Sequence, residues 1–277
     1  MSLRCLIVAS GASALIAWSS TAQSAAIGRF GGPFVAGAMR TGDAAQVERE
    51  WAQERFERPL RLRIGVDSGD GLEVTKLARW LQQRHPVIKL EKDCVEACAR
   101  DLLPAGRAWL ADDGVLIAFS SVDAWPLLVK QSVDEGRLFL DGNAASQDSR
   151  DRFMAKYRPF WEQAAVILSL REQNAGLPAP AQQFLDRLTR PTGVDSLAFS
   201  GSQFQFTFRH SEWGCMAWVP DVRGLKQLGI DLPGYQPPAL ADAAKRLKLP
   251  VERIYIGSIP DAPPEGPLCR VEAATAP

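Results

Sequence analysis

The stretch between residues 60 and 119 alternates short apolar segments with a segment of helical spacing, and this alternation limits the fold more than any other feature. Residues 60–66, 87–90 and 115–119 have the short apolar or alternating pattern of strands. Residues 72–84 place apolar side chains at spacings of three and four, which predicts an amphipathic helix. Strands joined through helices form βαβ units with parallel strands. The sequence therefore predicts an α/β fold with repeated βαβ units.

Different patterns lie on either side of this core. Residues 148–188 are mostly helical in spacing, and residues 196–220 alternate aromatic with polar side chains, which predicts a pair of strands. Residues 140–150 form the best candidate boundary. We expect a signal peptide over residues 1–26, an irregular mature N-terminus over 27–59, an α/β core over 60–145, and a helical and aromatic-rich part over 146–277 packed on the core.

The N-terminus has the pattern of a secretory signal peptide. Arg4 supplies the positive charge, residues 5–18 are mostly apolar, and small polar residues follow. The apolar run is too short for a membrane-spanning helix, and no later segment is long enough. We expect cleavage near Ala22 or Ala26, a periplasmic or secreted bacterial protein, and no integral membrane segment after the signal is removed.

The cysteines agree with export. Of five cysteines, Cys5 would leave with the signal peptide, and Cys94, Cys98, Cys215 and Cys269 would remain. An even number in an oxidising compartment predicts disulfides, although two pairs allow three connectivities. The simplest pairing joins Cys94 to Cys98 and Cys215 to Cys269. A metal site is the competing interpretation, but no histidine lies near either pair in the sequence, so we expect no metal.

Charge and glycine patterns exclude two classes of partner. Lysine and arginine total 32 residues and so do aspartate and glutamate, so no net field favours nucleic acid. The turn Gly69-Asp70-Gly71 lacks the third glycine of a dinucleotide fingerprint. We therefore expect no nucleic-acid partner and no bound cofactor.

The centre of the core is the segment Asp-Cys-Val-Glu-Ala-Cys-Ala at residues 93–99, which lies between a predicted strand and a predicted short helix. Such junctions often hold functional groups, because helix N-terminal N–H groups point toward them. With the Ser-Gly-Asp-Gly turn at residues 68–71, this segment resembles exported Clp-protease-like proteins of the ClpP/crotonase superfamily. The resemblance covers about residues 60–122. It implies the ClpP/crotonase-like α/β fold and, because that fold usually assembles, a homo-oligomer.

The residues at the family's catalytic positions differ from its pattern. That pattern has a Cys-x-Ser-x-Cys-Ala motif with a serine nucleophile, and a histidine base after the next strand. Here the nucleophile position holds Glu96 and the base position holds Ser120, while Asp70 replaces a turn glycine. The resemblance therefore implies a pseudoenzyme that acts in binding or assembly, with a peptide or protein as ligand. Its binding residues would be Ser68, Gly69, Gly71 and Ala97.

Two alternatives remain open at this stage. Glu96 and Asp70 could act as acid and base in a hydrolase or lyase, because two carboxylates held close together acquire different pKa values. A relocated serine nucleophile, such as Ser68, is the weaker alternative, since the two histidines, His85 and His210, fall elsewhere. The simpler interpretation of Glu96 is an acid that stabilises a helix N-terminus.

Overall fold

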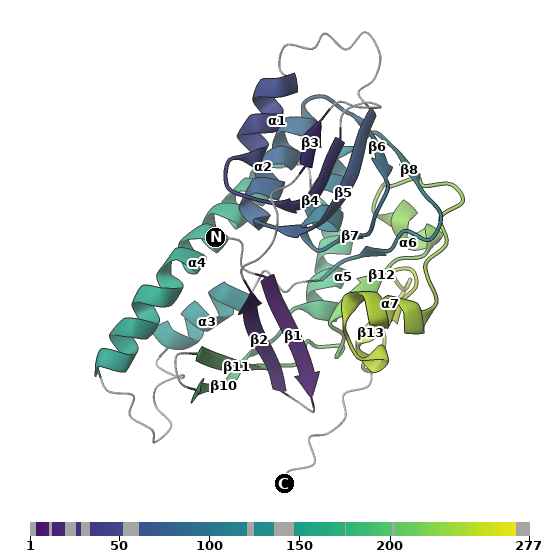
Figure 1. The fold of residues 1–277 in the computed structure, drawn as a ribbon. Coiled ribbons are helices and arrows are strands. Elements are labelled where there is room, and N and C mark those ends of the chain that lie inside the picture. Colours follow the sequence, from purple (N-terminus) through teal and green to yellow (C-terminus); the bar gives the residue numbers. More distant parts are fainter. Residues whose placement is uncertain are drawn as a thin grey trace.

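A computed structural model gives the fold of the chain (Figure 1). It describes residues 4–10, 13–19, 26–28, 34–51, 61–120, 125–135, 147–174, 176–200 and 203–269. The predicted boundary near residue 145 and a cleavage site near Ala22 both lie outside the described residues. The fold is a mixed α/β structure with a parallel sheet and helices, and this confirms the predicted fold class.

The main sheet has five strands, in the order β3-β4-β5-β6-β8. They are β3 (Ala26–Gly28), β4 (Phe34–Met39), β5 (Arg61–Gly69), β6 (Val87–Leu90) and β8 (Ala108–Ala111). Strands β4, β5, β6 and β8 run parallel, whereas β3 is antiparallel to β4. The helix α2 (Gly71–Gln82) connects β5 to β6, which is the predicted βαβ unit.

The core lies between this sheet and its helices. Helix α2 buries the apolar face that its spacing predicts, including Leu77, Ala78 and Leu81. Helix α1 (Asp43–Trp51) packs beside α2, and Trp51 and Trp80 lie with ring centroids 6.1 Å apart. Burying side chains of this size contributes about 1.5–3 kcal/mol each, so this face of α2 is a main source of stability.

A second set of strands joins the core to the C-terminal part. It comprises β7 (Cys94–Val95), β9 (Ile117–Ala118), β12 (Ala217–Val219) and β13 (Ile254–Ile256). The pairs β7–β9 and β12–β13 are both parallel. Phe119 and Trp218 bridge the two pairs with reciprocal N–H···O bonds of 2.8 and 2.9 Å. Segments far apart in sequence therefore meet directly beside the motif at residues 93–99.

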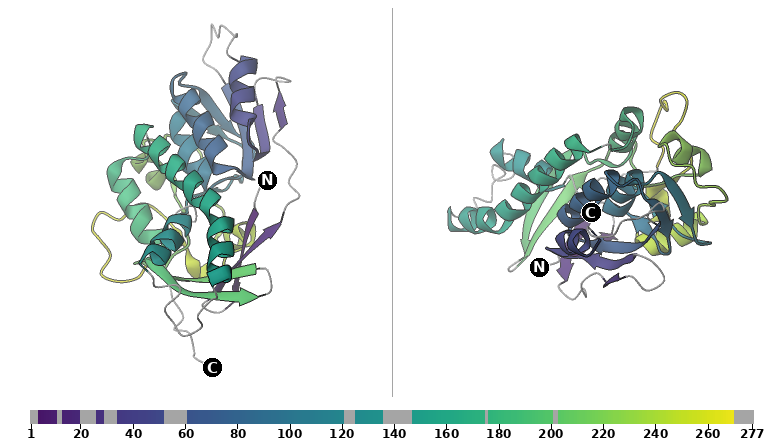
Figure 2. Two further views of the ribbon diagram at one scale, coloured as in Figure 1. Left: turned by 90° about the vertical axis from the view of Figure 1, so that its left-hand side faces the viewer. Right: turned by 90° about the horizontal axis from the view of Figure 1, so that it is seen from above.

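The remaining elements lie mostly around these sheets. Figure 2 shows that α4 runs along one side of the molecule, where it contacts α2 and α3. The helices are α3 (Trp125–Asp134), α4 (Gln147–Gln173), α5 (Ala179–Thr189), α6 (Val222–Gln227) and α7 (Leu240–Leu247), with short π and 3-10 turns at η1 (Cys98–Leu102), η2 (Leu103–Ala105) and η5 (Val251–Arg253). Two antiparallel pairs complete the fold: β1 (Arg4–Ser10) with β2 (Ser13–Ser19), and β10 (Gly193–Ser200) with β11 (Gln203–Arg209).

The structure differs from two of the local predictions. Residues 27–59 were expected to be irregular apart from a short helix over residues 43–55, but they also contain β4, a member of the main sheet. Strand β8 was not predicted at all. The β10–β11 pair confirms the predicted strand pair. Residues inside the expected signal peptide form β1 and β2, and its cleavage stays a prediction.

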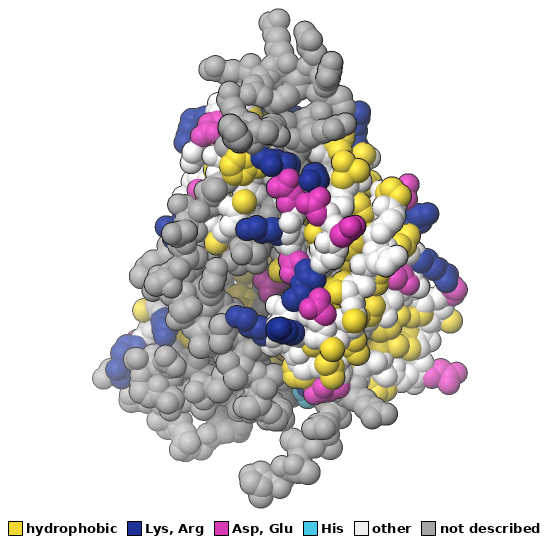
Figure 3. Space-filling view, turned by 45° about the vertical axis from the view of Figure 1, so that its right-hand side comes forward, with side chains coloured by type: hydrophobic (Ala, Val, Ile, Leu, Met, Phe, Trp, Pro, Cys, Tyr) yellow, Lys and Arg dark blue, Asp and Glu magenta, His cyan; other side chains and the backbone are white. Residues whose placement is uncertain are grey.

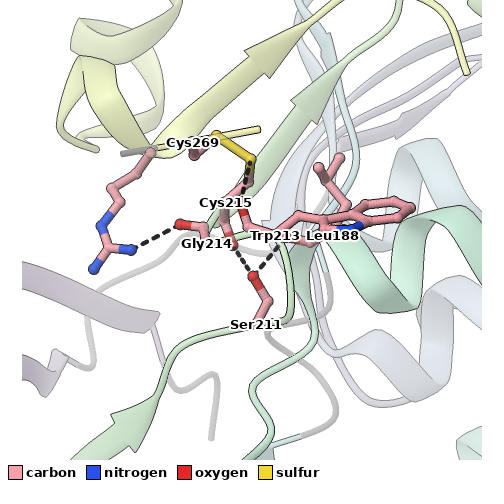
Figure 4. The surroundings of a disulfide bond; sticks show 7 residues. Leu188, Ser211, Trp213, Gly214, Cys215 and Cys269 are labelled. Atoms are coloured by element: carbon pink, nitrogen blue, oxygen red, sulfur yellow. Dashed lines mark hydrogen bonds between the residues drawn. A yellow bond between two sulfur atoms is a disulfide. The ribbon is translucent and has the colours of Figure 1, made fainter. Parts of the chain in front are cut away.

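The cysteine pairing follows the simplest of the three connectivities. Disulfides join Cys94 to Cys98 and Cys215 to Cys269. Around the second one, Cys269 donates its N–H to the Trp213 carbonyl, and Ser211 donates to the Cys215 carbonyl (Figure 4). Within the described residues, no helix could span a bilayer and no group of three metal-binding side chains gathers.

Candidate functional site

The fold brings the motif residues to one end of three neighbouring strands. Asp70 directly follows β5, Glu96 follows β7, and Ser120 lies just after β9. Strands β7 and β9 pair in parallel with Val95 opposite Ala118, and β5 packs beside β7. The carboxyl ends of these strands therefore form the candidate site.

Glu96 forms a tight elbow between β7 and η1. Its φ angle is 53°, a left-handed conformation that non-glycine residues seldom adopt. Its N–H donates to the Ala118 carbonyl at 3.0 Å, and its own carbonyl accepts from the Arg100 N–H at 2.9 Å. The buried disulfide between Cys94 and Cys98 spans the elbow, while Glu96 itself is exposed. A strained strand-to-helix turn of this kind is where hydrolases expose a nucleophile.

Asp70 has a different environment, because its carboxylate takes part in local hydrogen bonds. Oδ1 accepts from the Leu72 N–H at 3.0 Å, so Asp70 is the N-cap of α2. The Gln163 side chain of α4 also donates to Oδ1, and the Thr41 hydroxyl donates to Oδ2 at 3.3 Å. The Asp70 N–H donates to the Met39 carbonyl at 2.8 Å. The role of Asp70 in the structure is therefore to cap and connect helices.

Helix α4 covers the start of α2. A Cβ added at Gly71 would lie 3.5 Å from Cδ1 of Ile167 on α4. One turn further along α4, Arg171 donates from Nε and Nη2 to the two oxygens of Asp101, at 2.8 and 2.7 Å. Asp101 also accepts from the Thr75 hydroxyl at 3.0 Å. This buried ion pair ties α4 to both η1 and α2, so α4 is held over the turn after β5.

Ser120 cannot replace the histidine base. Its Oγ is buried and has no hydrogen-bond partner within the described part of the chain. His85 lies beyond the C-terminal end of α2, whereas Asp70 lies at the N-terminal end. His210 follows β11, and Nη2 of Arg253 lies 2.8 Å from its Nδ1. Burial lowers the pKa of Arg253. Neither histidine therefore lies at the carboxyl ends of β5, β7 and β9.

The other expected binding residues are backbone elements of the same site. Ser68 and Gly69 pair with Ala38 and Met39 of β4. The Ser68 side chain lies outside the described part of the structure. Gly71 is the first residue of α2, and Ala97 directly precedes η1 and is half-buried. The strand ends thus bring these positions to the same region, without a described side-chain contact between Asp70 and Glu96.

The C-terminal part supports the elbow from the adjacent strand. The Tyr235 hydroxyl accepts from the Ile117 N–H at 3.3 Å, and burial raises the pKa of Tyr235 to about 12. Asp93 accepts from the Leu116 N–H at 3.1 Å and pairs with Arg246 of α7. Sequence reasoning missed these supports, as it missed Gln163 and the pair between Asp101 and Arg171, because nothing in a single sequence signals contacts between such distant positions.

A pocket of about 340 Å³ lies between η1, α4 and α5, near the site but not on it. Its walls combine arginines, carboxylates and apolar side chains, among them Arg100, Asp101, Ile167, Asp186 and Arg190. None of Asp70, Glu96 and Ser120 lines this pocket.

Comparisons with known proteins give only distant structural likenesses. No family model matches the chain, and no curated protein matches it. A solved structure from Acinetobacter baumannii, named as an enoyl-CoA hydratase/isomerase, is 14% identical, with a TM-score of 0.28 over 55% of this chain and 86% of its own. Two from Mycobacterium avium paratuberculosis K-10, named as enoyl-CoA hydratases, are 12% and 11% identical, with TM-scores of 0.27 and 0.24. They cover 55% and 57% of this chain, and 87% of each of their own. With TM-scores this low, the likenesses carry no argument about the reaction.

Proposed function

We propose that this chain is an exported, Clp-protease-like pseudoenzyme that has lost the serine nucleophile and histidine base and acts in binding or assembly. The observation that carries the proposal is the elbow at Glu96. Its left-handed backbone and its flanking disulfide form the frame of a nucleophile turn, but the side chain in that frame is a carboxylate. The backbone turn of a nucleophile site without the nucleophile supports a protein that retains the turn but has lost the catalytic reaction.

The surrounding groups also argue against serine peptidase chemistry. Acyl transfer needs a hydroxyl or thiol, a base that takes its proton, and N–H donors for the oxyanion. Glu96 supplies no hydroxyl, and Ser120 is no base. The Asp70 N–H is already donated to Met39. A carboxylate at the nucleophile position would also repel the negative charge that develops on the substrate oxygen.

A fluorophosphonate probe tests the loss of nucleophile directly. We expect no covalent labelling of any serine in the purified protein, and labelling of one would overturn the pseudoenzyme proposal. The double variant Glu96→Ser/Ser120→His is the converse test. If the frame is intact, this variant should gain labelling by the probe, while Glu96→Ser alone, which still lacks a base, should react much more slowly.

A hydrolase or lyase that uses Glu96 and Asp70 as acid and base is the alternative, and the exposure of Glu96 at the strand ends favours it. The capping role of Asp70 counts against it, because that carboxylate already accepts bonds from Leu72 and Gln163. Activity screened on the purified protein separates the two functions. A turnover that disappears in Glu96→Gln would support acid–base catalysis, and no turnover in either protein would favour binding.

Export is part of the same proposal, and two disulfides support an oxidising compartment. The intact mass of protein recovered from the periplasm should correspond to cleavage near Ala22 or Ala26, with all four remaining cysteines oxidised. A cytoplasmic protein of full mass with free thiols would contradict it. The proposed ligand is a peptide or protein, and the proposed assembly is a homo-oligomer.

A further inference from the structure

The main sheet ends in strand β8, which pairs with β6 on one side only. No described strand lies along its other edge. Such an edge is a template for pairing with another chain, and proteins commonly protect it with charged residues or proline. The four residues of β8, Ala-Trp-Leu-Ala, contain neither. The shortness of β8 is therefore its only protection of this kind within the strand itself.

The direction of the backbone groups on β8 follows from its pairing. Asp112 donates its N–H to the Leu90 carbonyl at 3.0 Å, while Glu91 donates to Ile64 of β5, so the even-numbered residues of β8 face β6. Backbone groups alternate along a strand, so Trp109 and Ala111 direct their N–H and C=O groups to the open edge. Ala108 is exposed, and Leu110 has 46% of its surface accessible. Figure 3 looks toward the side of the molecule where β8 lies in Figure 1, and hydrophobic side chains gather on that side beside charges of both signs.

The charges at the two ends of β8 have opposite signs. A second copy related by a two-fold axis would therefore place its acidic end beside the basic end of the first. Arg107 precedes the strand, and Asp112 and Asp113 follow it. Asp112 pairs with Lys89 at 3.0 Å, but Arg107 and Asp113 are exposed and have no ion pair within the described residues. In an antiparallel pair of β8 strands, Arg107 of each copy would meet the acidic end of the other. An extended peptide of unrelated sequence offers no such match.

We infer that the open edge of β8 pairs antiparallel with β8 of a second copy of this chain, with Leu110 opposite Leu110 on the two-fold axis. In this register the outward-facing groups of Trp109 meet those of Ala111 of the other copy, and Arg107 meets Asp113. The five-stranded sheet then continues through the dimer as ten strands. This inference names an interface for the proposed homo-oligomer, but it does not depend on the pseudoenzyme role.

Sedimentation velocity of the purified full chain over a concentration series tests the dimer. We expect a monomer–dimer equilibrium, because a short isologous strand pair buries little surface. Arg107→Asp should raise the dimer dissociation constant about tenfold or more, since two attractive pairs become repulsive. Asp113→Arg should have a similar effect. The double variant Arg107→Asp/Asp113→Arg should restore most of the association, which a change in folding alone would not produce.

Two further variants test the strand register. The Ala111 N–H faces the open edge, so Ala111→Pro should keep the β6 pairing and abolish the dimer. If that variant does not fold, the charge exchange above still decides the matter. In an oxidised dimer, Leu110→Cys should form a symmetric crosslink, because residues opposite each other at a non-hydrogen-bonded position lie about 4.5 Å apart. Ala108→Cys is the matched control and should not crosslink.

The proposal fails under any of three results. A chain that stays monomeric at all concentrations overturns it, whether the edge then binds an extended peptide or nothing. A dimer that is unaffected by Arg107→Asp and by Asp113→Arg forms through another surface. Equal crosslinking through residues 108 and 110 contradicts the two-fold axis at Leu110.

Discussion

The two strand-to-helix turns of the candidate site differ in how their carboxylates are used. Asp70, after β5, caps α2 and accepts a further bond from Gln163 of α4. Glu96, after β7, has a left-handed backbone and an exposed side chain. The carboxylate of the first turn contributes to helix packing, whereas the second turn presents its side chain outward. If the site functions as proposed, that function should depend on the turn at Glu96.

The largest expected effect concerns the helix that covers the turn at Asp70. Asp101→Ala should lower the free energy of unfolding by about 3–5 kcal/mol, because it removes the carboxylate that accepts two bonds from the largely buried Arg171 guanidinium. Urea denaturation followed by circular dichroism measures the change. Glu265→Ala, which removes an exposed glutamate without an ion pair among the described residues, is the control and should change stability by less than about 0.5 kcal/mol. Equal effects of the two variants would show that α4 is not held by this ion pair.

The second effect concerns the support beneath the turn at Glu96 and appears at alkaline pH. Burial raises the pKa of Tyr235 from 10.0 to about 12. Above pH 10 the unfolded chain ionises Tyr235 while the folded chain does not, so this stabilisation is complete below pH 10 and is lost as the pH rises toward 12. By pH 11.5 the loss should reach about 2 kcal/mol.

Tyr235→Phe is the matched variant for that pH dependence. At pH 7 it should be less stable by about 1–2 kcal/mol, since the buried Ile117 N–H loses its acceptor. Between pH 10 and 11.5, however, its stability should fall less steeply than that of the unchanged chain. Chemical denaturation at each pH measures the stability of both proteins. If their stabilities fall in parallel between pH 10 and 11.5, Tyr235 is not buried beside β9.

Asp70→Ala should have a smaller effect, localised at the other turn. Loss of the N-cap costs about 0.5–2 kcal/mol, and the hydrogen bonds from Gln163 and Thr41 are lost with it. Asp70→Asn, whose side chain can still cap the helix, should recover most of the stability. Thermal unfolding of the three proteins gives the comparison. If Asp70→Asn is as unstable as Asp70→Ala, the charge rather than the cap is what matters at this turn.

The parts of the fold that were predictable depend on local patterns. Strand β6 has the predicted bounds, and α2 buries the face that its spacing indicates. The disulfides were also predictable, because four cysteines joined in two pairs allow only three arrangements. The position of Glu96 at an elbow followed from the change of pattern at residues 93–99, although its left-handed φ angle was visible only in the structure.

The parts that were missed depend on tertiary contacts. Strand β4 contains alanine and a glycine, Gly37, with a φ angle of 88°, and such residues have low strand propensity on their own. The short strand β8 has no alternation strong enough to identify it, and it exists because β6 lies beside it. The pair between Asp101 and Arg171 joins positions 70 residues apart. This pair holds α4 over the turn after β5, and no pattern in a single sequence predicts such a contact.

The smallest effect tests the elbow itself. At a φ angle of 53°, a β-branched side chain is disfavoured and glycine is accepted without strain. Glu96→Val should therefore be less stable than Glu96→Gly by about 1–2 kcal/mol, while Glu96→Gly should be close to the unchanged chain. The same substitutions at Ala97, which has an ordinary helical φ angle of −60°, form the control, and there the glycine variant should not be favoured in this way. Denaturation midpoints for the four variants measure the difference. Should valine and glycine be equivalent at Glu96, the left-handed elbow would be absent in solution, and the contrast between the two turns would disappear with it.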